Sequence, residues 1–397
     1  MAERINPDFK SDLRHYGLGP WNECYHCGGC TATCPLSESD NLFPRRGIRL
    51  AQMGLEGSLV SSVDPWLCYY CGDCSKTCPR GANPGEFMMV LRRYLTSRYD
   101  WTGISRLFYR KKILEMLAIV LLAAGIIISF LMFLPPSPRL VTAPEAFING
   151  QGGVMINSLS EVATGDQFVR WIEYGDLAMA VIVAFLLISN ILHMFYRVIL
   201  SDRSLRIPIL SYFTEFWHLV YNFLTQARFS KCESKTYWLG HLWLMTGYTI
   251  MFVIIVGFLA EFQIEEVRPW YNWQRLLGYY ATIGLLCFIT YTIIGRIKKK
   301  AAKMQFSHPS DWMFLILLLL TTITGILVHI FRITGLPAAT YYTYLIHLAV
   351  LVPMIVIEVP FSKWSHLAYR PFAIYFDRLR KAGIQTELQT DIAKAIL

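Results

Sequence analysis

Six long apolar runs constrain the fold of this chain more than any other feature. Each approaches the roughly 20 residues that a helix needs to cross a bilayer. They lie at Ile113–Leu134, Asp176–Leu200, Leu239–Ala260, Leu276–Gly295, Trp312–Phe331 and Tyr344–Pro360, and the last, which is short, runs on to about residue 363. With 54% hydrophobic and 16% charged residues, the chain is too apolar for an ordinary soluble protein of 397 residues. We therefore predict six transmembrane helices.

The apolar runs divide the chain into three parts. Residues 1–110 are mixed and polar, and we expect them to form a soluble domain. Residues 111–366 would form the membrane domain, and residues 367–397 a tail. The first residues, Met-Ala-Glu-Arg-Ile-Asn-Pro, do not resemble a secretory signal peptide. We therefore expect the soluble domain and the tail in the cytoplasm, where thiols stay reduced and cysteines serve metals rather than disulfides.

The distribution of basic residues agrees with this orientation. With the N-terminus inside, the inner loops and the tail hold Arg203, Arg206, Arg228, Lys231, Lys235, Arg296, Lys298, Lys299, Lys300, Lys303, Lys363, Arg370, Arg378, Arg380, Lys381 and Lys394. The outer loops hold only Arg139, Arg170, Arg268, Arg275 and Arg332. The positive-inside rule thus predicts a multi-pass protein of the cytoplasmic membrane. The net charge of +9 reports this orientation, and we expect no nucleic-acid partner.

Eight of the ten cysteines form two copies of the pattern Cys-x2-Cys-x2-Cys-x3-Cys-Pro. This is the run of bacterial two-cluster ferredoxins, in which the fourth cysteine binds the other cluster. We therefore expect two [4Fe–4S] clusters. Cluster 1 would be held by Cys24, Cys27, Cys30 and Cys78, and cluster 2 by Cys68, Cys71, Cys74 and Cys34. Two zinc knuckles are the alternative, but a zinc site has no use for the third and fourth cysteine in this register.

The segment between the two motifs indicates the fold class. It is longer than in small two-cluster ferredoxins, and Arg45–Leu59 within it has helical periodicity. We therefore predict an all-α protein, with an α-helical ferredoxin domain followed by a six-helix membrane bundle. Gly28, Gly29, Gly72 and Gly81 suit either close backbone approach to a cluster or ordinary turns. Cys232 and Cys287 stand alone, and for Cys287 we expect simple packing in its membrane run.

Ionisable side chains inside a membrane are costly and usually functional. Five histidines lie in, at the ends of or directly after the apolar runs, namely His193, His241, His329, His347 and His366. Neutral imidazole is the usual axial ligand of haem b. We expect haem b in the bundle, because two clusters alone would leave electrons at the membrane surface. For each histidine, a hydrogen bond to a neighbouring carbonyl at the interface is the alternative.

Two modules of the chain resemble known families. The stretch Cys24–Arg92 resembles the iron–sulfur C subunit of heterodisulfide reductase, through Glu-Cys-Tyr-His-Cys-Gly-Gly-Cys-Thr-Ala-Thr-Cys-Pro and Trp-Leu-Cys…Cys-Pro-Arg-Gly. The stretch Leu239–Tyr369 resembles the cytochrome b subunit of respiratory nitrate reductase, through His347-Leu and Pro360-Phe-Ser-Lys-x-x-His366. Their fusion is similar to the C subunits of the quinone-interacting membrane-bound oxidoreductase (Qmo) family. This resemblance implies menaquinone as substrate, partners like the flavoprotein A subunit of heterodisulfide reductase, and a link to adenylylsulfate reductase in sulfate respiration.

The resemblance also implies haem ligands. It places one haem b between His241 and His366, near the inner face. The family's second haem uses His347 and a histidine at the position that Met251 occupies here. Three possibilities remain for the outer site: His347 with Met251, His347 with His329, or no haem.

The spacing within the last run departs from the family pattern. His347 and His366 are 19 residues apart, one more than in the family, and an extra residue rotates a regular helix by about 100°. Pro353 and Pro360 lie between them, and a bulge there would absorb the extra residue. Glu358, the one carboxylate deep in this run, either bonds to a neighbour or moves protons at an inner quinone site, and Lys363 is a second candidate for such a role.

Taken together, these features predict the electron-transfer and quinone-interacting subunit of a multisubunit oxidoreductase, with the direction of flow left open. The first alternative is a membrane subunit of another heterodisulfide-reductase-like or formate-linked complex. An alternative of another class is a zinc-binding membrane scaffold without redox activity.

We expect soluble partners on the head, where Arg45, Arg46 and Arg49 form either a docking face or a solvated helix face that offsets cluster charge. The connection Pro135–Tyr174 carries no cysteine or histidine, and Ile207–Phe229 is a candidate amphipathic helix on the inner surface.

Overall fold

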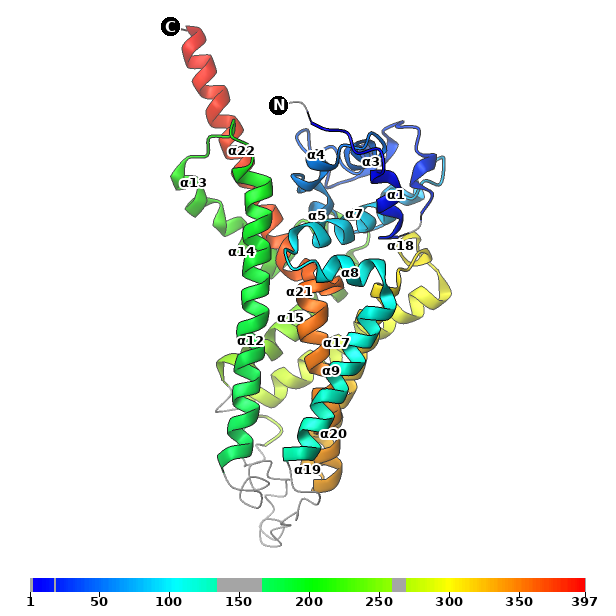
Figure 1. The fold of residues 1–397 in the computed structure, drawn as a ribbon, viewed down its shortest axis with the longest axis vertical. Coiled ribbons are helices and arrows are strands. Elements are labelled where there is room, and N and C mark those ends of the chain that lie inside the picture. Colours follow the sequence, from blue (N-terminus) through cyan, green and yellow to red (C-terminus); the bar gives the residue numbers. More distant parts are fainter. Residues whose placement is uncertain (1–2, 18, 134–165, 259–268, 397) are drawn as a thin grey trace.

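A computed structural model of the chain describes residues 3–17, 19–133, 166–258 and 269–396. Within these residues the protein is helical, with no strand and only an isolated bridge between Glu38 and Asn41. The N-terminal helices form a head at one end of a bundle of long helices, and both termini lie at the head end (Figure 1). The predicted all-α fold is confirmed.

Short helices build the head, because glycines and prolines interrupt its chain repeatedly. They are α1 (Phe9–Arg14), η1 (Pro20–Glu23), α2 (Gly29–Thr33), α3 (Arg45–Gln52), α4 (Glu56–Val60), α5 (Asp64–Leu67), α6 (Asp73–Lys76), α7 (Pro84–Tyr99) and α8 (Ile104–Arg110). The helical pattern predicted over Arg45–Leu59 is divided into α3 and α4 by Gly54. Gly54 has φ +73°, and a Cβ there would lie 2.5 Å from the carbonyl oxygen of Asn6, so only glycine fits.

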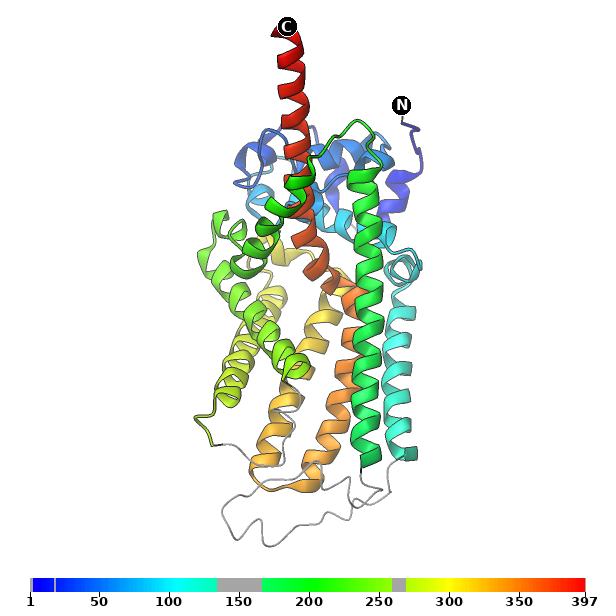
Figure 2. The same cartoon turned by 90° about the vertical axis from the view of Figure 1, so that its left-hand side faces the viewer.

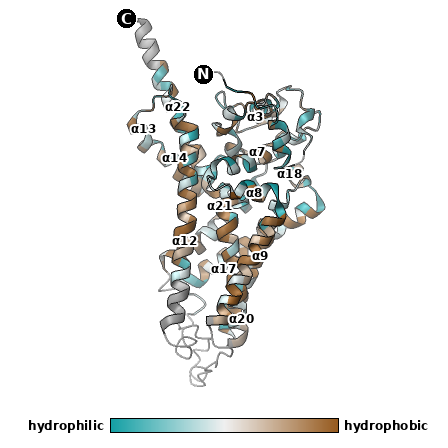
Figure 3. Ribbon diagram, viewed as in Figure 1, coloured by the Kyte–Doolittle hydropathy of each residue, from teal (hydrophilic) through white to brown (hydrophobic). Residues whose placement is uncertain are grey.

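In the part of the chain that the structure describes, six helices are long and apolar enough to cross a membrane, as predicted. The spanning segments are Lys112–Met132, Tyr174–Leu200, Lys235–Gly257, Trp273–Lys298, Pro309–Ile333 and Ala338–Phe361. They belong to α9 (Lys112–Phe133), α12 (Asp166–Phe195) with the π-helix η2 (Tyr196–Leu200), α15 (Lys235–Gly257), α17 (Trp273–Lys298), α19 (Pro309–Ile333) and α20 (Pro337–Pro353) with its continuation. Apolar residues dominate these helices, whereas the head is more hydrophilic (Figure 3). The predicted end of the third run at Ala260 and most of the connection 135–174 lie outside the described residues.

The last spanning helix is the central one. Half of its apolar window is buried inside the protein, compared with 11% for the first span, whose side chains mostly face outward. It packs against α19 and α9. After Pro353 it continues as the π-helix η4 (Met354–Glu358) and then as the short helix α21 (Val359–Phe361). A π-turn contains one residue more than an α-turn, so η4 is the bulge that the spacing of His347 and His366 predicted.

The chain between the second and third spans forms two helices rather than one. They are α13 (Ile209–Thr214) and α14 (Phe216–Thr225), followed by the 3-10 turn η3 (Phe229–Lys231). A further short helix, α18 (Ala302–Gln305), follows α17 on the same side. After the sixth span, the 3-10 turn η5 (Lys363–Ser365) leads into α22 (His366–Ile396), which runs up beside α12 and α14 to the C-terminal end (Figure 2).

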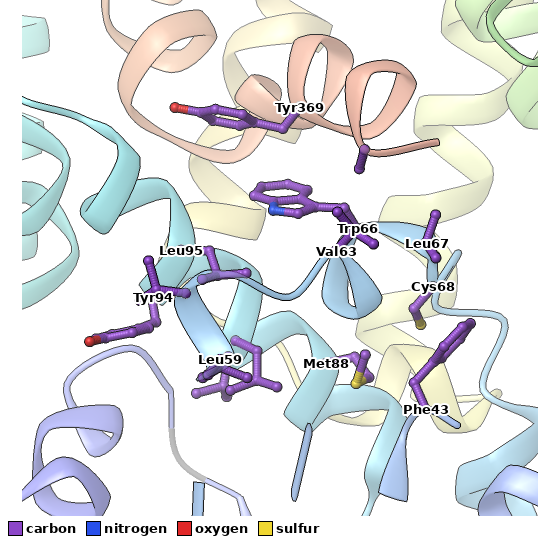
Figure 4. Close-up of a cluster of buried hydrophobic side chains, with 14 of the residues drawn as sticks. Phe43, Leu59, Val63, Trp66, Leu67, Cys68, Met88, Tyr94, Leu95 and Tyr369 are labelled. Atoms are coloured by element: carbon purple, nitrogen blue, oxygen red, sulfur yellow. The ribbon is translucent and has the colours of Figure 1, made fainter. Parts of the chain in front are cut away.

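The head and the adjoining ends of the long helices share one hydrophobic core. Trp66 of α5 packs on Tyr369 of α22 with ring centroids 4.9 Å apart. Figure 4 shows Tyr369 lying above Trp66, with Leu67 and Cys68 on the stretch of chain that follows Trp66. The ring of Tyr99, at the end of α7, also contacts Tyr369 at 5.6 Å. The head is therefore packed directly against the membrane part.

Candidate functional site

The two cysteine motifs adopt the same local backbone. The second residue after the first cysteine has a left-handed conformation in both, with φ 59° at His26 and 55° at Tyr70. This turn directs the backbone N–H of His26 at the sulfur of Cys24, at 3.4 Å, and the N–H of Tyr70 at the sulfur of Cys68, at 3.3 Å. Backbone N–H groups that point at sulfur are suited to thiolates, because they stabilise negative charge on it.

Each motif then enters a short helix through a left-handed glycine. Gly28, with φ 85°, precedes α2, which carries Cys30, and Gly72, with φ 91°, precedes α6, which carries Cys74. The two short helices pack against each other. Both Cys30 and Cys74 are buried, so the third cysteine of each motif points into the head rather than into solvent.

The thiols fall into two neighbouring groups. Burial raises the pKa of the Cys30 thiol, and three nearby thiols raise it further, those of Cys24, Cys27 and Cys78. Burial also raises the pKa of Cys34 to about 12, and the nearby thiols here are those of Cys68 and Cys71. The same two thiols and that of Cys34 raise the pKa of buried Cys74, with a smaller effect from Cys30. These neighbours match the two ligand sets that the ferredoxin pattern predicts.

Such a group of neighbouring thiols, some of them buried, fits a metal cluster. Thiolates crowded together in a low-dielectric interior repel one another, and a cationic iron core compensates that repulsion. The all-cysteine donor set is the one that [4Fe–4S] clusters use.

The two groups differ in their exposure. In the first motif Cys27 is exposed, and the side chain of Tyr25 is 70% exposed beneath the guanidinium of Arg80. In the second motif Cys68 and Tyr69 are each only 7% exposed. The cluster 1 group therefore faces solvent, whereas the cluster 2 group lies against the membrane part.

The basic face of α3 is smaller than its sequence suggested. The guanidinium of Arg46 donates two hydrogen bonds to the fully buried carboxylate of Asp64, at 2.7 and 2.8 Å. Arg45 and Arg49 are exposed, and Arg45 lies close to Gly28 of the first motif. Only these two arginines remain available to a partner.

An aromatic contact joins the second motif to the membrane part. The ring of Tyr69 stacks on Phe229 of η3 at a centroid distance of 4.9 Å, and Phe229 meets the ring of His241 edge-on at 5.6 Å. Arg370 of α22 lies 4.4 Å above Tyr69 and donates a hydrogen bond to the carbonyl of Cys68 at 3.4 Å. The second cysteine motif therefore reaches His241 through two side-chain contacts.

His241 and His366 line one cavity, although they lie on α15 and α22. Nδ1 of His366 is 2.7 Å from the carbonyl oxygen of Lys363, which only accepts hydrogen bonds, so Nδ1 carries the proton and Nε2 keeps its lone pair. Nδ1 of His241 is 2.9 Å from Oε1 of Gln226, which favours the same tautomer. The cavity is also lined by Tyr69, Asn222, Phe223, Met245, Tyr248, Leu367, Arg370, Pro371 and Ile374.

The hydrogen bonds of the two rings follow the pattern of iron-ligating histidines. Iron-ligating histidines usually donate their second ring N–H to a carbonyl or carboxylate, which fixes the tautomer and the ring orientation. Burial lowers the pKa of His366 well below its ordinary value, so the ring is neutral, as a ligand must be.

The other predicted haem residues are placed differently. His347 on α20 has Nδ1 2.9 Å from the hydroxyl of Thr324. His329 has Nε2 2.9 Å from the hydroxyl of Tyr279. Met251 is partly buried on α15. The His347 ring therefore matches the ligand pattern of the inner site better than the His329 ring, and its partner ligand stays a prediction.

Both ring nitrogens of His193 are already hydrogen-bonded. Its Nδ1 lies 2.9 Å from the carbonyl oxygen of Tyr99, and its Nε2 accepts a hydrogen bond from Arg197 at 3.2 Å. No lone pair is left for iron in this arrangement. The structure thus favours the interfacial alternative for His193, in which it connects α12 to the end of α7.

Two buried carboxylates lie near the inner ends of the first and last spans. Glu115 on α9 and Glu358 at the end of η4 are both 0% exposed. Glu115 accepts hydrogen bonds from Lys112, at 2.9 Å, and from the hydroxyl of Ser362, at 2.7 Å. Neither carboxylate oxygen of Glu358 has a hydrogen-bond partner among the described residues.

Lys363 belongs to an ion-pair network between the head and the membrane part. Its ammonium contacts the buried carboxylate of Asp311 at the start of α19. Arg93 of α7 also pairs with Asp311, at 3.2 Å, and with Glu86, at 3.1 Å. Because the carbonyl of Lys363 orients His366, this network positions the haem-ligand candidate relative to the head.

Sequence reasoning missed several of these residues. Glu115 was detectable, since it is a carboxylate beside an apolar run. Gln226, Phe229 and Cys232 carry no such signal, because loop residues become significant only through what the fold brings to them. Cys232 was noted only as an isolated cysteine, and the structure places its thiol beside Cys71.

Comparison with known proteins supports iron–sulfur clusters in this domain. Residues 20–82 match the family model of a 4Fe-4S dicluster domain. This range contains all eight cysteines of the two motifs. No curated protein and no solved structure matches the chain.

The chain combines an iron–sulfur domain with six helices, among the described residues, that are long and apolar enough to cross a membrane. This combination is typical of membrane electron-transfer subunits. A dicluster match also favours iron over the zinc-scaffold alternative.

Proposed function

We propose that the protein is the membrane subunit of a quinone-linked oxidoreductase, which passes electrons between menaquinone or menaquinol and soluble redox partners. One observation carries this proposal. The buried cysteine motif and the pocket of His241 and His366 are joined by the contacts of Tyr69 with Phe229 and of Phe229 with His241. Electron transfer needs redox centres close together, and these contacts bring the two candidate sites together.

The residues have separate roles in this proposal. The two cysteine sets hold two [4Fe–4S] clusters, and His241 and His366 hold haem b. When bound, these groups supply one-electron carriers in series. His347 is the candidate for a second, outer haem, with Met251 or His329 as the other ligand or with no haem there at all. Arg370 lies between cluster 2 and the pocket, where its positive charge stabilises reduced, more negative centres.

Quinol oxidation releases protons as well as electrons, so a proton acceptor is needed on the inner side. Glu358 is suited to this task, because its carboxylate is fully buried and has no hydrogen-bond partner among the described residues. Glu115 and Lys112 lie nearby and connect toward the head. Lys363 is engaged by Asp311, so we assign it to positioning rather than to proton transfer.

Soluble partners would meet the exposed first cysteine motif. The head would lie on the cytoplasmic side of the inner membrane, where the loop charges are basic. Within the resemblance to the Qmo family, the partners are subunits like the flavoprotein A subunit of heterodisulfide reductase, and the complex serves adenylylsulfate reductase in dissimilatory sulfur metabolism. A heterodisulfide-reductase-like or formate-linked complex would use the same site.

Metal and haem analysis tests the proposal. The purified protein should contain about eight non-haem irons per chain and at least one haem b, with visible bands that change on dithionite reduction. Zinc in place of iron, or iron without haem, would contradict it. Substituting His241 by Ala should remove the inner haem, whereas the matched change of His193 to Ala should leave haem content intact.

A further inference from the structure

Cys232 lies against the second cysteine motif, although it belongs to the membrane part of the chain. It directly follows η3 and is only 1% exposed. The sulfur atoms of Cys71 and Cys232 and a carboxylate oxygen of Asp73 all lie within 4.8 Å of one another. Its neighbour Phe229 is the residue that contacts both Tyr69 and His241.

Polar contacts fix this position. The backbone N–H of Glu233 donates a hydrogen bond to Asp73 at 3.3 Å, and the carboxylate of Glu233 pairs with Lys76 at 2.8 Å. Both contacts hold the segment after η3 on α6, the short helix of the second motif. These two contacts therefore hold Cys232 next to Cys71.

Cys232 is suited to donate a hydrogen bond rather than to bind iron. The doubled motif already supplies four cysteines for each of two cubes, so a ninth thiol has no iron left to ligate. The S–H group of a thiol is a weak hydrogen-bond donor. The sulfur of Cys71, when it binds iron, is a thiolate and thus an acceptor.

We propose that the thiol of Cys232 donates an S–H···S hydrogen bond to the cluster-ligating sulfur of Cys71 and thereby raises the reduction potential of cluster 2. Reduction adds negative charge to the cluster and its sulfurs, and a donor stabilises that charge. Hydrogen bonds to the sulfurs are among the determinants of cluster potentials. This proposal rests on the proposed function in one respect, that Cys71 holds iron.

The consequence is that the membrane part tunes the cluster nearest to it. Cluster 1 has no counterpart of Cys232 among the described residues near it, and its motif faces solvent. The reduction potential of cluster 2 would therefore be raised relative to that of cluster 1, although the two cysteine motifs are nearly identical.

A redox titration followed by EPR tests this directly on the full-length protein in detergent. Cys232→Ala should lower the potential of one cluster and leave that of the other unchanged. We expect about a fivefold shift in the equilibrium, as for one net hydrogen bond, or about 40 mV at 59 mV per tenfold for a one-electron couple. Cys232→Ser, which keeps a donor, should recover much of the shift. Cys287→Ala, at the other isolated cysteine, is the matched control and should change neither potential.

The possible failures are distinguishable. Intact clusters with unchanged potentials in Cys232→Ala would overturn the role of Cys232 alone, and loss of one cluster would show that Cys232 is a ligand rather than a donor. A wild-type protein that purifies with zinc and little iron would instead overturn the proposed function.

Discussion

The hydrogen bond from His241 to Gln226 offers a sharp test of the inner haem site. Gln226 lies at the end of α14, and its Oε1 is 2.9 Å from Nδ1 of His241. Replacing Gln226 by Met keeps the length of the side chain and removes the amide acceptor. Losing such a second partner of a ligand typically costs 10–100-fold in affinity for the bound metal. That range corresponds to about 1.4–2.7 kcal/mol of haem binding free energy.

Haem content and haem potential are the readouts. Gln226→Met should retain haem less well than wild type when washed with a haem-binding competitor, as measured by the pyridine haemochrome assay. Gln226→Glu is the matched control, since a carboxylate still accepts from Nδ1. Its charge makes the ligand more electron-rich, so it should keep haem and lower the haem potential. Unchanged haem retention and potential in Gln226→Met would refute the assignment of His241 as a ligand in this geometry.

Four further predictions follow from other contacts. Arg93→Met leaves the buried carboxylate of Glu86 without its cation and removes one of the cations that pair with Asp311, so we expect a loss of about 3–5 kcal/mol in the free energy of unfolding and earlier thermal loss of cluster absorbance. Glu358→Gln should slow quinol oxidation by about a hundredfold while dithionite reduction stays normal, and an unchanged rate would exclude it as the proton acceptor. The double change of Arg45 and Arg49 to Glu should weaken partner binding and make it depend more steeply on salt, while the cluster and haem spectra stay unaltered. Unaffected binding at low ionic strength would exclude this face as the docking site. Burial alone would raise the pKa of Glu38, but Lys381 and Arg228 hold that pKa below its ordinary 4.5. The ion pairs of Glu38 should therefore stop stabilising the docked α22 as pH falls through the lowered pKa. Faster hydrogen exchange in α22 at low pH would report this loss.

The features that sequence predicted well are those with a local signal. The six spans were predicted from apolar runs long enough to cross a bilayer. The iron–sulfur domain was predicted from a cysteine spacing that is specific to [4Fe–4S] clusters. The π-helix Met354–Glu358 could be anticipated, because the segment from His347 to His366 is one residue longer than in the family pattern. A bulge between the two prolines accommodates that residue.

The features that sequence could not predict depend on contacts between distant segments. Arg46 looked like part of an exposed basic face, but it is paired with Asp64, 18 residues further along the chain. His241 gains its acceptor from a different helix, and Cys232 gains its neighbour from the head. No periodicity encodes such pairings, since they arise only when separate helices and loops pack together.

Electron transfer between cluster 2 and quinone through the site of His241 is the central claim, and one kinetic measurement tests it most directly. Protein in liposomes containing menaquinone would be reduced with dithionite, freed of reductant, and mixed with a lipid-soluble oxidised menaquinone analogue while cluster and haem absorbances are followed. We expect rapid reoxidation of clusters and haem in the wild type. In His241→Ala we expect cluster reoxidation to be about a hundredfold slower or more, on the order of the loss for a missing catalytic group. Cluster reoxidation at the wild-type rate in His241→Ala, with intact clusters, would exclude electron transfer through this site.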